Sequence, residues 1–218
     1  MAFTLTLLDA LTHGPKPPNE DAHGAAAGAA WVIDGATGVG LGPDLLMPSG
    51  AAWLAGTLSE TLAGIFREDA ATDLDVAIAR AEERVGRRYA DAVRGEPVPD
   101  APDMPTPCLG LAVAEGASLT LGVIGDISIL HRSLDGRVTH LTDSASGVFS
   151  ALTLAMLAEV RAARPGEDPW PHLRGQIREN RRMANRPGGY SVVHPVLPWR
   201  ERVEVTRVTP SAGDVVLI

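Results

Sequence analysis

Three acidic residues near the start of the chain are the first candidates for chemistry. They lie in two short motifs, Glu20-Asp21 and Asp34-Gly35, within a stretch of small residues that runs from Asn19 to Gly38. Carboxylates and backbone carbonyls are the ligands that hard cations such as Mg²⁺ and Mn²⁺ prefer, and glycine lets a carbonyl come close. The alternative is that both motifs are ordinary turns, in which such residues are common.

The apolar run between the two motifs indicates how their carboxylates could converge. Residues 29–33 are short, apolar and bounded by glycines, which is typical of a buried strand. This strand delivers Asp34 to its C-terminal end. If residues 20–24 pair beside it, Asp21 reaches the same edge of the sheet, and the pair predicts a divalent metal site.

A further acidic residue, Asp126, follows a glycine at the end of another predicted strand. Short apolar segments separated by glycine turns predict an antiparallel meander in this part of the chain. The expected strands of this meander cover residues 108–114, 118–125, 127–132 and 137–142.

The elements that must carry these residues alternate between strands and helices. Apolar positions recurring every three or four residues predict helices, and alternating positions predict strands. We expect helices over 49–66, 73–93, 149–163 and 170–185, an opening strand over 3–8, and a hairpin-like tail over 189–197, 202–209 and 214–218. This order predicts an α+β fold in one domain spanning 1–218, with the proline-rich segment 95–107 as an internal loop.

Composition excludes several classes of protein. The 218 residues carry a net charge of −8, and the 19 Lys and Arg are scattered, which argues against a nucleic-acid partner. One short arginine cluster is expected to be a solvated helix face: Arg178, Arg181, Arg182 and Arg186. No apolar run approaches a membrane span, and there is no signal peptide. We expect a cytoplasmic monomer with no membrane partner.

Motifs for other chemistries are missing from the sequence. It contains no GxxxxGK[ST], no strand-linked GxGxxG, no GxSxG and no HExxH. The single cysteine, Cys108, excludes an intramolecular disulfide and a CxxC zinc site, and we expect it to be structural. The acidic residues therefore lack nitrogen and sulfur ligands, which favours an all-oxygen Mg²⁺ or Mn²⁺ site over zinc.

Taken in order, the motifs of this chain resemble those of the metal-dependent serine/threonine protein phosphatases of the 2C (PPM) type found in bacteria. The resemblance is distributed over the whole chain, and its specificity comes from the order of the motifs. The matching segments are Asn19–His23, Val32–Gly35, Gly122–Ser128, Leu141–Ser144 and the closing Gly213–Ile218.

The resemblance implies a four-layer α-β-β-α sandwich in which two antiparallel sheets are flanked by helix pairs. It also implies hydrolysis of phosphoserine and phosphothreonine in protein substrates, by attack of a water that two Mn²⁺ or Mg²⁺ ions bridge. By motif position, Asp21, Asp34 and the Gly35 carbonyl are metal ligands, and Asp34 bridges the ions. Glu20 acts through metal-bound water, and Asp126 matches an aspartate associated with a third ion.

Three departures from the family pattern qualify this implication. Lys16 stands where many members carry a phosphate-binding arginine, and it keeps the charge without the bidentate fork. Ala36 replaces a histidine that some members use as general acid. The chain also ends before a further Asp-Gly motif that completes the family's metal site, so the resemblance implies a domain without its C-terminal strands and helix.

These departures keep two other functions open. One is a catalytically incomplete phosphatase-like domain that binds a phosphoprotein or another protein partner. The other is a hydrolase of small phosphorylated metabolites, because substrate choice depends on surface loops that one sequence does not decode.

Overall fold

A computed structural model describes residues 3–13, 17–39 and 46–218 of the chain. In these residues it has four α-helices, two short 3-10 helices and eight strands. The helices are α1 (Gly50–Glu68), α2 (Leu74–Ala92), α3 (Ala145–Ala163) and α4 (Trp170–Arg181), with η1 (Ala101–Asp103) and η2 (Arg200–Arg202). The strands are β1 (Ala22–Ala26), β2 (Ala29–Asp34), β3 (Cys108–Glu115), β4 (Ser118–Ile124), β5 (Ser128–Arg132), β6 (Val138–Thr142), β7 (Glu204–Val208) and β8 (Val215–Leu217).

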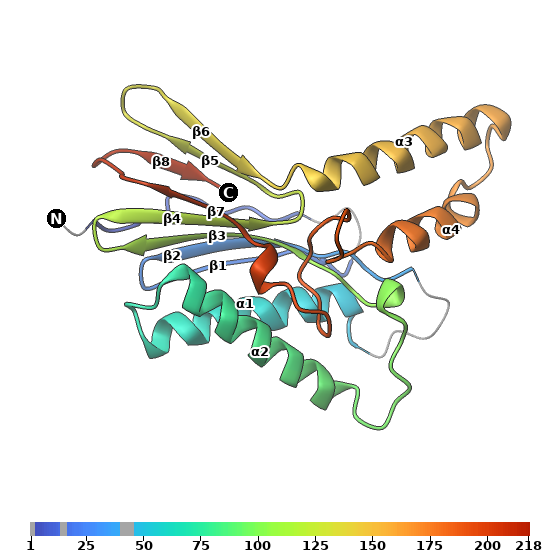
Figure 1. The fold of residues 1–218 in the computed structure, drawn as a ribbon, viewed down its shortest axis with the longest axis horizontal. Helices are drawn as coiled ribbons and strands as arrows, with labels where there is room; N and C mark the ends of the chain where they lie inside the picture. The colour runs from blue at the N-terminus through green and yellow to red at the C-terminus, as the bar shows by residue number, and fades with distance from the viewer. Residues whose placement is uncertain (1–2, 14–16, 40–45) are drawn as a thin grey trace.

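The strands form two antiparallel sheets that lie one above the other (Figure 1). The first sheet has the order β1-β2-β3-β4-β7, and the second has the order β6-β5-β8. The α+β class and the two antiparallel sheets are thus as predicted. The predicted pairing of the last two strands is wrong, because β7 joins β4 in the first sheet and β8 joins β5 in the second.

A buried acidic side chain explains why β8 pairs with β5. Asp214 lies 3.0 Å from the Nε2 atom of His131 on β5, and it accepts a hydrogen bond from the backbone N–H of Leu134 at 3.0 Å. Both partners belong to the β5–β6 hairpin, so the start of β8 is held against that hairpin and away from β7. A buried carboxylate that is satisfied in this way is stabilising.

Helices α1 and α2 cover the outer face of the first sheet (Figure 1). Ser49 and Asp73 cap them, each accepting a hydrogen bond from a backbone N–H three residues on. The apolar stripes predicted from the sequence are buried against the sheet, and Trp31 of β2 stacks on Phe66 of α1 with ring centroids 6.2 Å apart. This packing fixes β2, the strand that ends at Asp34.

A second core fills the space between the two sheets. Successive side chains of β4 point to opposite faces of the sheet. Leu119, Leu121 and Val123 face the second sheet, while Gly122 faces α2. These side chains pack with Ile129 of β5. The two cores fix β4 on both faces, and its end leads directly to Asp126.

The predicted opening strand over residues 3–8 is not formed. Phe3 and Leu5 pack against the core between the sheets, whereas Leu7, Leu8 and Leu11 are 61%, 81% and 89% exposed. The alternating pattern is typical of a strand, but a strand also needs a neighbouring backbone for its hydrogen bonds. No described strand lies beside this segment to provide it.

The predicted strand over residues 189–197 is also wrong, since the segment is buried but irregular. Its backbone is bonded to side chains and to other loops instead of to a strand. Asn185 pairs with both the N–H and the carbonyl of Val192, and the Val193 N–H donates to the carbonyl of Pro107. Burial lowers the pKa of His194 to about 4, so its neutral ring accepts backbone hydrogen bonds.

Helices α3 and α4 correct the expected four-layer sandwich. They pack against each other at one end of the sheets, and α3 has no buried residue (Figure 1). The reason lies in the anchors of α4. Arg178 of α4 donates hydrogen bonds to Asp100 and Asp103 in the segment before β3. These bonds hold α4, and with it α3, beside the two sheets and away from the outer face of the second sheet. The fold therefore consists of two sheets, the helix pair α1–α2 on the outer face of the first sheet, and the helix pair α3–α4 at one end of the sheets.

Helix α3 also corrects the statement about membrane spans. Its 19 residues are long and apolar enough to cross a membrane, by length and composition alone. The length of the apolar run did not reveal this because serine, threonine, glutamate and arginine interrupt the apolar residues of the helix.

Candidate functional site

Strand pairing brings Asp21 and Asp34 to the same edge of the first sheet. Ala22 of β1 lies opposite Ile33 of β2, so the residues just outside this pair, Asp21 and Asp34, are neighbours. The backbone N–H of Gly35 lies 3.4 Å from the Oδ1 atom of Asp21. The convergence predicted from the apolar run is confirmed for these two carboxylates.

Asp126 reaches this edge from the corner at which the chain leaves the first sheet for the second. Gly125 makes that corner with a φ of +84°, a conformation that favours glycine. Cys108, which lies opposite Asp34 in the β2–β3 pair, donates its thiol hydrogen to the Oδ1 atom of Asp126 at 3.3 Å. Burial and the Asp126 charge raise the pKa of Cys108, so this thiol is a protonated structural donor.

The electrostatics of Asp34 reveal an uncompensated negative cluster. Burial, together with the charges of Asp21, Asp126 and Glu20, raises the pKa of Asp34 to about 6. A side-chain hydrogen bond with Asp21, which forms only when Asp34 is protonated, contributes to the same shift. A cation at this edge would offset the repulsion and favour the ionised pair.

The donor set fits a hard divalent cation in chemistry but is sparse in number. Asp21 and Asp34 are in contact, and the backbone of Gly35 lies beside them. In residues 3–13, 17–39 and 46–218, however, no group of three or more His, Cys, Asp and Glu side chains is gathered closely enough to hold a metal ion. The described residues therefore bring together two carboxylates and the Gly35 backbone, which are fewer protein oxygens than a complete Mg²⁺ or Mn²⁺ site uses.

Glu20 faces away from this pair toward the start of α1. Its Oε1 atom accepts hydrogen bonds from the hydroxyls of Thr37 at 2.5 Å and Ser49 at 2.7 Å. Because Ser49 is the N-cap of α1, Glu20 ties the loop after β2 to that helix. Lys16, the predicted phosphate-binding residue, lies outside the described residues.

Close backbone approaches hold the loop that follows Asp34. A Cβ atom added to Gly35 would lie 2.1 Å from the Glu20 carbonyl oxygen, and one added to Gly38 would lie 1.8 Å from the Asp103 carbonyl oxygen. Thr106 donates its N–H to the carbonyl of Ala36 at 3.1 Å. The proline-rich segment before β3 thus packs directly against the site loop.

Arg181 is the residue at this site that the sequence did not reveal. The expected solvated arginine face is wrong for it and for Arg178, because both side chains of α4 turn toward the body of the protein. Arg181 donates to the carbonyls of Thr37 at 2.8 Å and Met104 at 3.0 Å, and burial lowers its pKa. It thereby connects α4 to the site loop. In the sequence, nothing distinguishes Arg181 from the other arginines of this cluster, so the contact could not be predicted.

Arg181→Gln is expected to loosen the loop that carries Gly35. The shorter amide cannot bridge both carbonyls, and the loss of a buried donor costs about 1–3 kcal/mol. Thermal unfolding gives the stability, and amide hydrogen exchange gives the local opening of residues 35–38. Arg182→Gln is the matched control, because that arginine pairs at the surface with Glu179. Equal exchange in the two variants would contradict the anchoring role.

Solved structures with the same fold include bacterial phosphatases. The catalytic domain of the serine/threonine protein phosphatase PstP in complex with two manganese ions matches with a TM-score of 0.53 and 19% identity, over 92% of this chain and 70% of that one. MsPP, a PPM phosphatase from Mycobacterium smegmatis in complex with cacodylate, matches with a TM-score of 0.54 and 19% identity, over 97% and 77%. PppA from Pseudomonas aeruginosa matches with a TM-score of 0.53 and 18% identity, over 92% and 69%.

Sequence comparison leads to the same family. No curated protein matches the chain. The model of the family described as "Protein phosphatase 2C" matches residues 15–185, which include Asp21, Asp34 and Asp126. This match covers well over half of the 218 residues. The chain therefore belongs to the protein phosphatase 2C family.

Proposed function

We propose that this protein is a divalent-metal-dependent phosphatase that hydrolyses phosphoserine and phosphothreonine in proteins. The observation that supports this most is the contact between Asp21 and Asp34 at the sheet edge, where the charge of Asp126 also raises the pKa of Asp34. Paired carboxylates of like charge beside a glycine backbone are suited to holding a divalent cation.

In this proposal each residue has a defined task. Asp21, Asp34, the Gly35 carbonyl and Asp126 would hold the cations, and the charges of Asp21 and Asp126 both act on Asp34. Bound Mn²⁺ or Mg²⁺ supplies Lewis acidity, which lowers the pKa of water and offsets charge on the phosphoryl oxygens. Asp34, once ionised, can orient the attacking water in line with phosphorus.

The remaining residues position the reacting groups. Glu20 holds the loop after β2 through Thr37 and Ser49, and Arg181 holds it from the side of α4. Lys16 is proposed to bind the phosphate of the substrate as a point charge. Because the substrate is a phosphorylated side chain of another protein, the site must be open to solvent, and Asp21 and Asp34 are both exposed.

The experiment is manganese-dependent release of phosphate from a phosphothreonine peptide by the purified protein. We expect saturable turnover with Mn²⁺ and none after chelation. A phosphotyrosine peptide and a small sugar phosphate, run side by side, test the substrate class. Absence of phosphate release from every substrate at saturating Mn²⁺ would contradict a phosphatase.

A second function is favoured by the absence of a group of three metal-binding side chains among the described residues. It is a phosphatase-like domain that binds a phosphoprotein without hydrolysing it. The same phosphothreonine peptide distinguishes the two functions: saturable binding that is independent of Mn²⁺, with no phosphate release, would support the binding domain.

A further inference from the structure

The outer edge of β7 is open. β7 is the last strand of the first sheet and pairs only with β4, in a regular antiparallel register from Leu119–Val208 to Val123–Glu204. None of the described residues forms a hydrogen bond to its other edge. Alternate residues of an edge strand direct their N–H and C=O groups outward, where they can pair with another extended chain.

Two of the usual protections of an edge, proline and a β-bulge, are absent from β7. It contains no proline, and its five residue pairs show no bulge. Its one basic side chain, Arg207, is turned back over the sheet, where it bonds to Glu115 at 2.8 Å and to the hydroxyl of Thr120 at 3.3 Å. Arg207 therefore does not shield the open backbone.

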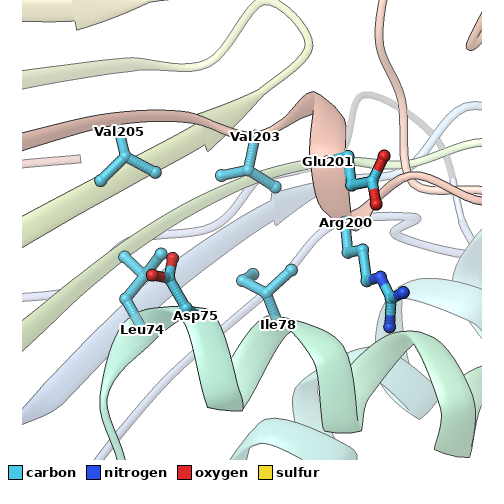
Figure 2. A pocket seen from close by; sticks show the side chains of 7 residues that line it. All are labelled: Leu74, Asp75, Ile78, Arg200, Glu201, Val203 and Val205. Carbon is cyan, nitrogen blue, oxygen red and sulfur yellow. The ribbon is translucent and has the colours of Figure 1, made fainter.

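A cavity of about 240 Å³ adjoins this edge. Figure 2 shows Leu74 and Ile78 of α2 on one side of it and Val203 and Val205 on the other. Val205 belongs to β7 and is 46% exposed. The cavity is the size for one or two apolar side chains, and a segment paired with β7 would carry alternate side chains past its opening.

The rim of the cavity is acidic. Asp75 and Glu201 line the cavity and are exposed, and neither forms an ion pair with another described residue. The one cation that lines the cavity, Arg200, lies 3.7 Å from Glu82, whose other oxygen accepts the Arg200 backbone N–H at 2.9 Å. Arg200 is thus held toward α2, and the rim offers uncompensated negative charge.

We propose that the open edge of β7 and the adjoining cavity form a docking site for an extended basic segment of a partner protein. The segment adds to the sheet as a further strand beside β7. One of its apolar side chains enters the cavity against Val205, and Lys or Arg side chains two residues to either side, which share that face of the strand, lie beside Asp75 and Glu201. Backbone hydrogen bonds give affinity, and the acidic rim gives the preference for basic sequences.

This docking site is separate from the carboxylate edge. The docked strand would lie two strand spacings, about 10 Å, from β4. It touches none of the residues that surround Asp34, so binding there does not depend on metal or on hydrolysis. Failure of one proposal is therefore distinguishable from failure of the other.

The test uses a fluorescent seven-residue peptide, Thr-Lys-Thr-Leu-Thr-Lys-Thr, with the metal-free protein; in an extended strand its leucine and both lysines share one face. Two control peptides replace the basic residues with glutamate or methylate alternate backbone nitrogens. Fluorescence anisotropy gives affinity, and amide hydrogen exchange of residues 204–208 gives location. We expect saturable binding of the basic peptide, slower exchange in β7, and no binding of either control.

Variants locate the site independently. Asp75→Lys/Glu201→Lys changes two exposed side chains that line the cavity, so the fold is retained, and we expect at least tenfold weaker binding. Val205→Lys is expected to weaken binding to a similar degree by closing the cavity. Glu159→Lys, an exposed reversal on α3, is expected to have no effect. Absence of peptide binding would overturn the proposal. So would binding that leaves the amide hydrogen exchange of β7 unchanged, or an equal loss of affinity in the Glu159→Lys variant.

Discussion

Asp34→Asn is expected to reduce manganese-dependent hydrolysis by about 100-fold or more, the scale of losing a central electrostatic group from an active site. Asp34 is in contact with Asp21, and the charges of Asp126 and Glu20 also act on it. It is therefore the carboxylate on which the charges of the cluster converge. Asparagine keeps the shape and one carbonyl oxygen but carries no negative charge. Steady-state hydrolysis of the phosphothreonine peptide at saturating Mn²⁺ measures the loss.

The same substitution should make the metal-free protein more stable at neutral pH. Because the fold raises the pKa of Asp34 to about 6, the native state binds this proton more tightly than the unfolded state does. The wild type therefore loses stability as pH rises from about 4 to about 6, and the loss is constant above that range. Asp34→Asn removes this cost.

Chemical unfolding of both metal-free proteins at pH 4 and pH 7 measures the difference. We expect equal stability near pH 4 and a gain of about 1 kcal/mol for the variant at pH 7, after allowance for the solvent access of the side chain. Asp135→Asn is the control, since that carboxylate lies in the exposed β5–β6 hairpin and has a pKa lowered to about 2. A variant that is less stable than wild type at pH 7 would show that the carboxylate cluster is not repulsive.

Gly125→Ala is expected to destabilise the protein by about 3 kcal/mol. The φ of +84° costs an alanine about 1–2 kcal/mol, and crowding of a packed position costs about 1–3 kcal/mol. The added Cβ atom would lie 2.2 Å from the Cys108 sulfur. Since relief of this clash must move Cys108 or the corner before Asp126, loss of stability should accompany loss of metal affinity.

Gly136→Ala separates the two causes. Gly136 has the same φ of +84°, but a Cβ atom there meets nothing within 4 Å. Its loss of stability should therefore be that of backbone strain alone. In the double variant Gly125→Ala/Cys108→Ala the clash with sulfur is absent, and we expect partial recovery. Equal losses at Gly125 and Gly136 would refute the steric part of the explanation.

The first half of the site was predictable because local rules determine it. A short apolar run between glycines ends at Asp34, and a tight turn returns the chain, so antiparallel pairing alone brings Asp21 to the same edge. Helices α1 and α2 were predictable for a similar reason, since their apolar stripes and their caps at Ser49 and Asp73 agree.

The contact of Arg181 with the site loop follows no local rule. It joins Arg181 to Thr37, 144 positions earlier in the chain, through a backbone carbonyl that any residue would provide. A run of arginines on a helix carries no information about which of them is buried. The anchoring of α4, and with it the position of α3, therefore had to come from the structure.

Strand errors have a different physical cause. Residues 3–8 and 189–197 have the alternation and β-branched residues of strands, and the pattern reports only that a segment is partly buried. Whether a strand forms depends on a partner backbone. Asn185 and Pro107 take that place for Val192 and Val193, and the β5–β6 hairpin draws β8 away from β7 through Asp214.

Titration of Mn²⁺ into the metal-free protein, followed by calorimetry at pH 7, tests the central claim most directly. The carboxylate edge predicts saturable binding and a rise in unfolding temperature with metal concentration. Release of protons on binding should grow as the pH is lowered from 7 to 6, because a larger share of Asp34 is then protonated and must ionise. Asp34→Asn should lose this binding and Asp135→Asn should keep it. Absence of saturable binding in the wild type, or unchanged binding in Asp34→Asn, would contradict a metal site at this edge.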